Sequence, residues 1–145
     1  MKAINIITHP YLLIISFLLL LISGQHFGGF YMLYLLMALP HGGIHALFAV
    51  AGIAILIVGQ IILKPGRKHQ VEPVLNIVGV ICLLVSIVLF FYNDKQKYNY
   101  DTFDQTVPLI TLSLFGILSA GFIIRNLVKF PDDKSENGNV SLKRL

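Results

Sequence analysis

The chain has 145 residues, of which 56% are hydrophobic and only 12% are charged, and its mean hydropathy is +0.79. Soluble proteins carry about 25% charged residues, so this composition excludes an ordinary water-soluble fold and predicts an integral membrane protein. The net charge of +4 does not indicate nucleic-acid binding, because the basic residues fall in short loops and near the C-terminus, where membrane topology accounts for them.

The N-terminal part of the chain contains 61 consecutive residues, 3–63, without a single Asp, Glu, Lys or Arg. A bilayer crossing needs about 20 apolar residues, so this stretch is too long for two helices and short for three. We expect a first span over residues 9–24, retained in the protein because Ile22-Ser23-Gly24 is a poor signal-cleavage site. The second span is expected over residues 44–63, where a basic loop ends it.

The segment between these two spans, residues 25–43, has an apolar centre that is too short to cross a bilayer. From Phe30 to Leu39 a helix would be about 15 Å long, half of the roughly 30 Å that a crossing needs. We predict a short helix over about 28–40 that either lies in the outer interface or enters the bilayer and returns. In an alternative topology the segment is a third, short crossing, which gives five spans and an external N-terminus.

Two further spans are predicted over residues 73–92 and 107–127, where Pro73 and Pro108 are placed as helix openers. The loop after the second span carries three basic residues, so the positive-inside rule puts this loop and both termini in the cytoplasm. The predicted fold class is therefore an all-α integral membrane protein of the plasma or inner membrane. Its domain, residues 1–129, contains four transmembrane helices and the short extra helix.

Residues 130–145 form a polar tail that we place in the cytoplasm. The tail has too few apolar side chains to bury a core of its own. We expect it to lack regular structure unless a partner or a neighbouring subunit holds it.

Small residues recur every three or four positions on the second, third and fourth predicted spans. Residues at this spacing share one helix face, and small side chains let helix backbones approach closely in lipid. We interpret them as packing positions, either inside one bundle or between copies of the chain. They are Ala46, Ala49, Gly52, Gly79, Cys82, Ser86, Ser113, Gly116 and Ala120. Because Cys82 is the single cysteine, the chain has no internal disulfide and no cysteine cage for a metal.

Histidines and glycines near the outer side are the candidate functional residues: His26, His41, Gly42, Gly43 and His45. His41 and His45 are four residues apart and would share a face if the helix began directly after Pro40. His26 could join them only if the chain folded back, or across a ring of subunits. Two ligands do not make a metal site, so three interpretations stay open: hydrated interfacial histidines, a water-filled pore mouth, and metal or haem ligation.

The order of a span, a short apolar helix, a Pro/Gly break with histidine and a small-residue span favours a homo-oligomeric channel, by analogy of layout. The alternatives are a non-enzymatic accessory or scaffold subunit, recruited through the 130–145 tail or the 93–107 loop, and a histidine-ligated metal or haem subunit. No charged residue lies in the interior of a predicted span, and no pair of side chains has the relation of nucleophile and base. We therefore expect no enzyme activity and no cofactor. The expected partners are membrane lipid, further copies of the chain and a protein that binds the tail.

Overall fold

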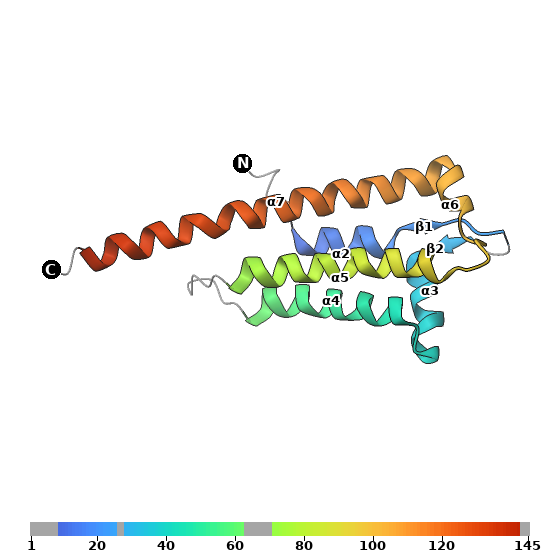
Figure 1. The fold of residues 1–145 in the computed structure, drawn as a ribbon, viewed down its shortest axis with the longest axis horizontal. Helices are drawn as coiled ribbons and strands as arrows, with labels where there is room; N and C mark the ends of the chain where they lie inside the picture. The colour runs from blue at the N-terminus through green and yellow to red at the C-terminus, as the bar shows by residue number, and fades with distance from the viewer. Residues whose placement is uncertain (1–8, 26–27, 63–70, 143–145) are drawn as a thin grey trace.

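The computed structural model describes residues 9–25, 28–62 and 71–142, and most of them are helical (Figure 1). In chain order the elements are α2 (Pro10–Leu18), β1 (Leu21–Ile22), β2 (Gly29–Phe30), α3 (Tyr31–Ala38), the 3-10 helix η1 (Leu39–His41), α4 (Ile44–Ile62), α5 (Val71–Asn93), α6 (Asp101–Asp104) and α7 (Thr106–Leu142). The predicted helical class is confirmed, except for one two-stranded hairpin that the sequence did not predict.

Three helices are long and apolar enough to cross a bilayer: α4 over Ile44–Ile61, α5 over Val71–Asn93 and α7 over Thr106–Val128. A helix of about 20 residues spans the roughly 30 Å of a hydrocarbon core. These helices correspond to the second, third and fourth predicted spans, so the chain has the helices of a membrane protein. In Figure 1, α4 and α5 form an antiparallel pair, and α7 runs back along the same direction as α4.

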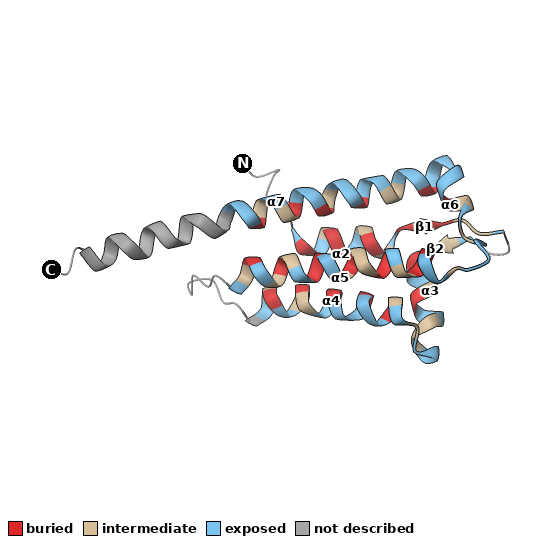
Figure 2. Ribbon diagram, in the orientation of Figure 1, coloured by how far each residue is buried: buried red, intermediate tan, exposed pale blue. Residues whose placement is uncertain are grey.

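The outward faces of the three helices are exposed (Figure 2), and many of the exposed residues on them are large and apolar. Ile61, Val88 and Ile117 are 67%, 65% and 71% exposed. An apolar surface of this extent is rare on a soluble monomer, whereas acyl chains solvate it at no cost. The buried core lies between the helices and includes Phe17 and Phe115.

The first predicted span, residues 9–24, is not one continuous helix, and the prediction of a fourth transmembrane helix is wrong in this respect. Helix α2 has nine residues and ends at Leu18, and the chain then becomes extended through β1. Nine helical residues rise only about 14 Å. The sequence from Leu18 to Ile22 contains no helix-breaking residue, so contacts with distant parts of the chain determine the break.

Two threonines from the C-terminal half satisfy the backbone of this extended stretch. Leu21 N–H donates to Thr111 Oγ1 of α7 at 3.1 Å. Ser23 N–H donates to Thr102 Oγ1 of α6 at 2.9 Å, and the same hydroxyl donates back to the Ser23 carbonyl at 3.0 Å. Non-helical backbone is tolerated at membrane depth only where protein covers it, and these hydroxyls provide that cover.

The hairpin supplies the remaining partners of the extended stretch. Strands β1 and β2 are antiparallel, and Tyr31 N–H donates to the Leu20 carbonyl at 2.7 Å. Farther along, Gln25 N–H donates to the Tyr98 carbonyl in the connection between α5 and α6. The strands, α3 and α6 therefore gather at one end of the helices, which we call the hairpin end (Figure 1).

The short helix predicted over 28–40 is observed as α3 followed by η1. It lies across the hairpin end instead of along the bundle (Figure 1). Tyr31 and Leu35 are buried against the bundle, while Met32, Leu36 and other apolar side chains on the opposite face are exposed. Both ends of the segment lie at the hairpin end, as expected for a segment that does not cross.

Helix α7 continues from Thr106 to Leu142, well beyond its apolar part, and it projects past the other helices (Figure 1). The expectation that the tail lacks regular structure is therefore wrong for residues 130–142. The physical reason is that extending an existing helix costs far less than nucleating a new one. The polar tail needs no core of its own because the span that precedes it has already formed the helix.

Candidate functional site

The most connected polar group at the hairpin end is the buried phenol of Tyr31, the first residue of α3. Its Oη lies 2.9 Å from Ser86 Oγ on α5, and Ser86 Oγ donates to the His45 carbonyl on α4 at 2.7 Å. Burial raises the pKa of the Tyr31 phenol well above its usual range, and the hydrogen bond with Ser86 only partly opposes this shift. The phenol therefore stays neutral and joins three helices through one chain of hydrogen bonds.

Phe90 of α5 is the centre of an aromatic cluster around this phenol. Its ring centroid lies 5.2 Å from that of Tyr31, 5.3 Å from that of Tyr34 and 5.4 Å from that of His45, each in an edge-to-face arrangement. Edge-to-face contacts at this spacing are favourable beyond the area that they bury. The cluster fixes α3 against α4 and α5.

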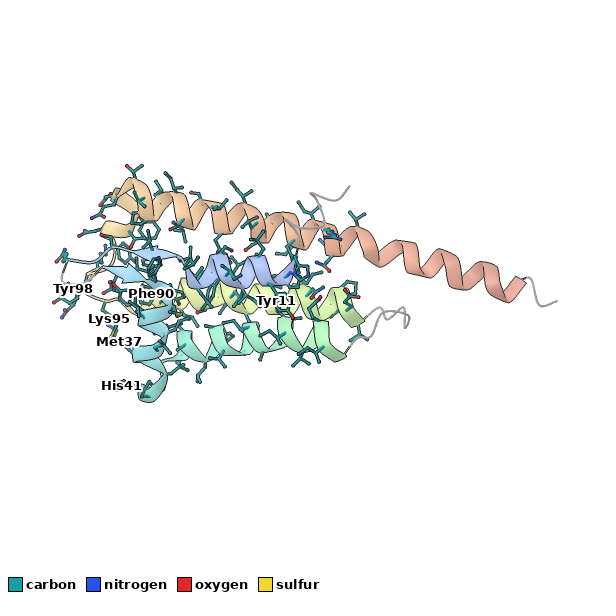
Figure 3. The ribbon with its side chains drawn as sticks, turned by 180° about the vertical axis from the view of Figure 1, so that it is seen from behind. Tyr11, Met37, His41, Phe90, Lys95 and Tyr98 are labelled. Atoms are coloured by element: carbon teal, nitrogen blue, oxygen red, sulfur yellow. The ribbon has the colours of Figure 1, made fainter. Side chains whose placement is uncertain are left out.

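The structure does not bring the predicted histidine site together. His41 is exposed at the end of η1, where its Nδ1 lies 2.9 Å from the Met37 carbonyl (Figure 3). His45 turns its ring towards Phe90, and its Nε2 is buried without a hydrogen-bond partner among the described residues. The third candidate, His26, lies outside the described residues.

The break between η1 and α4 explains this separation. Helix α4 begins at Ile44, and Gly42 before it has a φ of +68° in the left-handed region. His41 and His45 therefore do not lie on one helix, and the condition for a shared face is not met. Within the described residues, no group of three or more His, Cys, Asp or Glu side chains is placed to hold a metal ion.

The two predicted glycines serve this turn. Gly42 supplies the positive φ, which a residue without Cβ adopts at little cost. At Gly43 a Cβ would lie 2.9 Å from the Ala38 Cβ and 3.2 Å from a ring carbon of His45. Both glycines thus allow α3 to fold tightly onto the start of α4.

The small residues of α4 and α5 meet each other inside the chain. A Cβ on Gly52 would lie 2.8 Å from the Gly79 carbonyl oxygen, and a Cβ on Gly79 would lie 2.7 Å from Leu56 Cγ. Cys82 also contacts the Gly52 position, and the other small residues of this seam are fully buried: Ala46, Ala49 and Ser86. These positions let the two backbones approach closely, as small residues do in membrane proteins.

The small residues of α7 have the opposite environment. Ser113, Gly116 and Ala120 are all exposed, and a Cβ built on Gly116 would meet nothing within 4 Å in the described structure. The same is true of Gly121. The packing surface of α7 within the chain consists of other residues, among them Phe115, Ser119 and Phe122. We call the exposed surface of Ser113, Gly116 and Ala120 the α7 small face.

A buried pair of asparagines links α5 to α7 towards the end opposite the hairpin. Asn76 Nδ2 donates to Asn126 Oδ1 at 3.0 Å, and Asn126 Nδ2 donates to the Phe122 carbonyl at 2.8 Å. Asn126 lies in the apolar part of α7. An amide side chain in such a helix usually pairs with a polar side chain on another helix, so its position was the sequence signal for this contact.

Near the hairpin end an open groove of about 420 Å³ lies between α5 and α7. Ile87, Val88 and Phe91 of α5 line it together with Leu112 of α7. The rings of Tyr100 and Phe103 also line it. Its lining is almost wholly apolar, which suits a hydrophobic ligand or a hydrocarbon chain.

Comparison of the chain with protein-family models, with curated proteins and with solved structures found no match. Function must therefore be argued from the arrangement of the residues themselves.

Proposed function

We propose that this chain is a non-catalytic integral membrane protein that self-assembles in the bilayer through the α7 small face. The observation that carries this proposal is the contrast between its glycines. At Gly52 and Gly79 the space that a side chain would need is occupied by a neighbouring helix of the same chain, whereas at Gly116 it is open. Small residues in transmembrane helices are favoured where another helix backbone approaches, and within the described chain no helix approaches Gly116.

A second copy of the chain is the occupant that this face fits. Copies inserted with the same orientation are related by a rotation axis along the membrane normal, so equivalent residues meet at equal depth. Gly116 would then lie near Gly116 of the other copy, with Ser113 and Ala120 one turn away on either side. Ser113 adds a hydroxyl that can donate a hydrogen bond across the contact.

For the topology we propose four crossings, the first of which is discontinuous. Helix α2 and the extended stretch from Leu20 to Gln25 together reach about 33 Å, which is enough to cross a bilayer. The hairpin end then lies outside and both termini lie in the cytoplasm, in agreement with the basic loop after α4. In this arrangement α3 is an interfacial helix and not a re-entrant one.

The size of the assembly tests the self-assembly proposal. The full chain in lipid nanodiscs is expected to give the mass of a dimer or a larger ring, and Gly116→Ile is expected to shift it to the monomer. Ala51→Ile is the matched control, because Ala51 is also an exposed small residue but lies on α4. A monomeric wild-type particle would overturn self-assembly. Stoichiometric recovery of a different protein would favour the accessory-subunit alternative.

A pore at the centre of a larger assembly is the second candidate, and the observation that favours it is the exposed hydroxyl of Ser113 on α7. In a ring whose copies meet at Gly116, the Ser113 hydroxyl would face the axis instead of the contact between copies. The conducting path would then follow α7, because His41 lies at a distant corner of the molecule (Figure 3). Planar-bilayer recording tests this: conductance that Ser113→Leu abolishes supports a pore, and a silent oligomer excludes it.

A further inference from the structure

The groove between α5 and α7 begins at the hairpin end and extends into the leaflet on that side. Ile87 lies six residues before Asn93, the last residue of α5, so the groove reaches about 9 Å down the helix. At that depth the surroundings are hydrocarbon, and Val88 at the rim is directed outwards. The groove is therefore open to the acyl chains of the bilayer along its length.

One wall of the groove consists of three aromatic rings that pack against one another. The ring centroid of Phe91 lies 4.8 Å from that of Phe103 and 5.9 Å from that of Tyr100, and the latter two are 5.7 Å apart. The Tyr100 hydroxyl also reaches the Phe91 carbonyl at 3.5 Å. Three rings that hold one another in place form a preformed wall, which lowers the entropic cost of binding a chain against it.

One charged side chain lies beside the Tyr100 ring, which lines this groove. Lys97 Nζ lies 5.7 Å from the centroid of the Tyr100 ring, within the range of a cation–π contact. The connection that carries it is organised by Asp94, whose carboxylate accepts hydrogen bonds from the Tyr98 and Asn99 N–H groups. The ammonium group therefore stands beside a ring that lines the groove.

The backbone conformation of Lys97 is unfavourable for a lysine and would be favourable for a glycine. Its φ is +56°, and it is the one non-glycine residue with a positive φ in the described structure. The left-handed region is unfavourable for a residue with a Cβ, and such strain marks positions where the side chain itself has a use. A lysine at this position thus points to a ligand that needs a cation beside the Tyr100 ring.

From these observations we infer a binding site for one phospholipid molecule from the leaflet at the hairpin end. One acyl chain lies in the groove along Ile87, Val88 and Leu112, and the phosphate meets Lys97. Asp101 and Asp104 of α6 follow Lys97 in the chain by four and seven residues. Two carboxylates so close in the chain to one ammonium group disfavour a headgroup with net negative charge and favour a zwitterionic one that carries its own ammonium group.

The experiment is a titration of the delipidated full chain with palmitoyl-oleoyl phosphatidylethanolamine, with bound lipid counted by native mass spectrometry. Lys97→Gly removes the cation and suits the positive φ, so the fold is retained, and Lys95→Ala is its control in the same connection. Val88→Trp fills the groove from its rim. Val78→Trp is the matched control, because Val78 is also exposed on α5 but lies away from the groove.

The expected result is one tightly retained phosphatidylethanolamine per wild-type chain. Lys97→Gly should weaken its binding about tenfold, as expected when one charged contact is lost, and Val88→Trp should abolish it, while both controls bind as the wild type does. Wild-type affinity in either Lys97→Gly or Val88→Trp would overturn the proposal. So would stronger retention of phosphatidylglycerol than of phosphatidylethanolamine. A change in oligomer mass for Val88→Trp without loss of lipid would show that protein occupies the groove, which also contradicts the proposal.

Discussion

The hydroxyl of Thr102 forms two hydrogen bonds with the backbone of one residue, accepting from the Ser23 N–H at 2.9 Å and donating to the Ser23 carbonyl at 3.0 Å. Thr102 is fully buried, and 79 positions separate the two residues in the chain. This contact pairs both backbone groups of Ser23 where the chain is extended after α2. The extended conformation of this stretch therefore depends on a side chain of α6.

Replacing Thr102 with Val should destabilise the protein by about 2 kcal/mol, because a partly buried N–H and a partly buried carbonyl each lose a partner, at the lower end of the range of about 1–3 kcal/mol. Thr102→Ser keeps the hydroxyl and should cost about 1 kcal/mol, the contribution of the lost methyl group. Unfolding of both variants in mixed micelles gives the comparison. Equal destabilisation by Val and Ser would show that the paired hydrogen bonds do not stabilise the extended stretch.

Gly79→Leu should destabilise the folded chain by about 1–3 kcal/mol, since its side chain would overlap Leu56 and force α4 and α5 apart. Gly116→Leu is the matched substitution on α7. It should leave the unfolding free energy of the monomer nearly unchanged, because no described atom lies within 4 Å of the added Cβ. Unfolding of both variants under monomeric conditions tests this. A large loss for Gly116→Leu would mean that α7 packs inside the chain through this face.

Asn126→Leu should cost about 1–2 kcal/mol, because Asn76 Nδ2 would then be buried in an apolar surrounding without an acceptor. Asn76→Leu should cost less, since it also removes the buried Asn76 Oδ1, which has no partner among the described residues. The double replacement should be less harmful than the sum of the two single ones.

A double-mutant cycle of unfolding free energies measures this coupling, which is expected to lie near 1 kcal/mol, the scale of hydrogen bonds between membrane helices. Additive effects would show that the two asparagines do not stabilise each other.

Stability should fall as the pH rises above about 10, because of Tyr31. Burial raises the pKa of its phenol above the value of 10.0 that applies in the unfolded chain. Between these two values the unfolded state loses the proton and the folded state keeps it, so unfolding becomes more favourable by about 1.4 kcal/mol per pH unit. Below pH 10 both states are protonated, and this contribution to the pH dependence vanishes.

The Tyr31→Phe variant should lose this alkaline dependence, at the cost of about 1 kcal/mol at neutral pH for the hydrogen bond with Ser86. Tyr92→Phe is the control for removal of a tyrosine hydroxyl from the surface, because Tyr92 is 78% exposed. Unfolding curves from neutral pH to above the ordinary tyrosine pKa of about 10 check both variants. An unchanged slope in Tyr31→Phe would contradict the assignment.

Much of the fold could be predicted from hydropathy and from the positions of the prolines. Long apolar stretches opened by Pro73 and Pro108 predicted α5 and the membrane part of α7, and the short apolar centre after Phe30 predicted a helix that does not cross. These features are local, because helix length and the cost of charge in lipid are set by consecutive residues. The spacing of Gly52 and Gly79 likewise marked positions of close helix approach.

Other features depended on residues that are distant in the chain. The stretch after Leu18 has the same apolar composition as α2, and it is extended because Thr102 and Thr111 supply partners for its backbone. The four-residue spacing of His41 and His45 suggested a shared face, but the left-handed Gly42 starts a new helix between them.

By itself, the sequence determined that this protein belongs in a bilayer, which segments are long enough to cross it and where small residues recur. Only the tertiary structure decided that the small residues of α4 and α5 face each other and that Gly116 faces away from the chain. The physical reason is that periodicity places a residue on one face of its helix, whereas the neighbour of that face is chosen by packing of the whole chain. Within the described residues, Gly116 has no such neighbour.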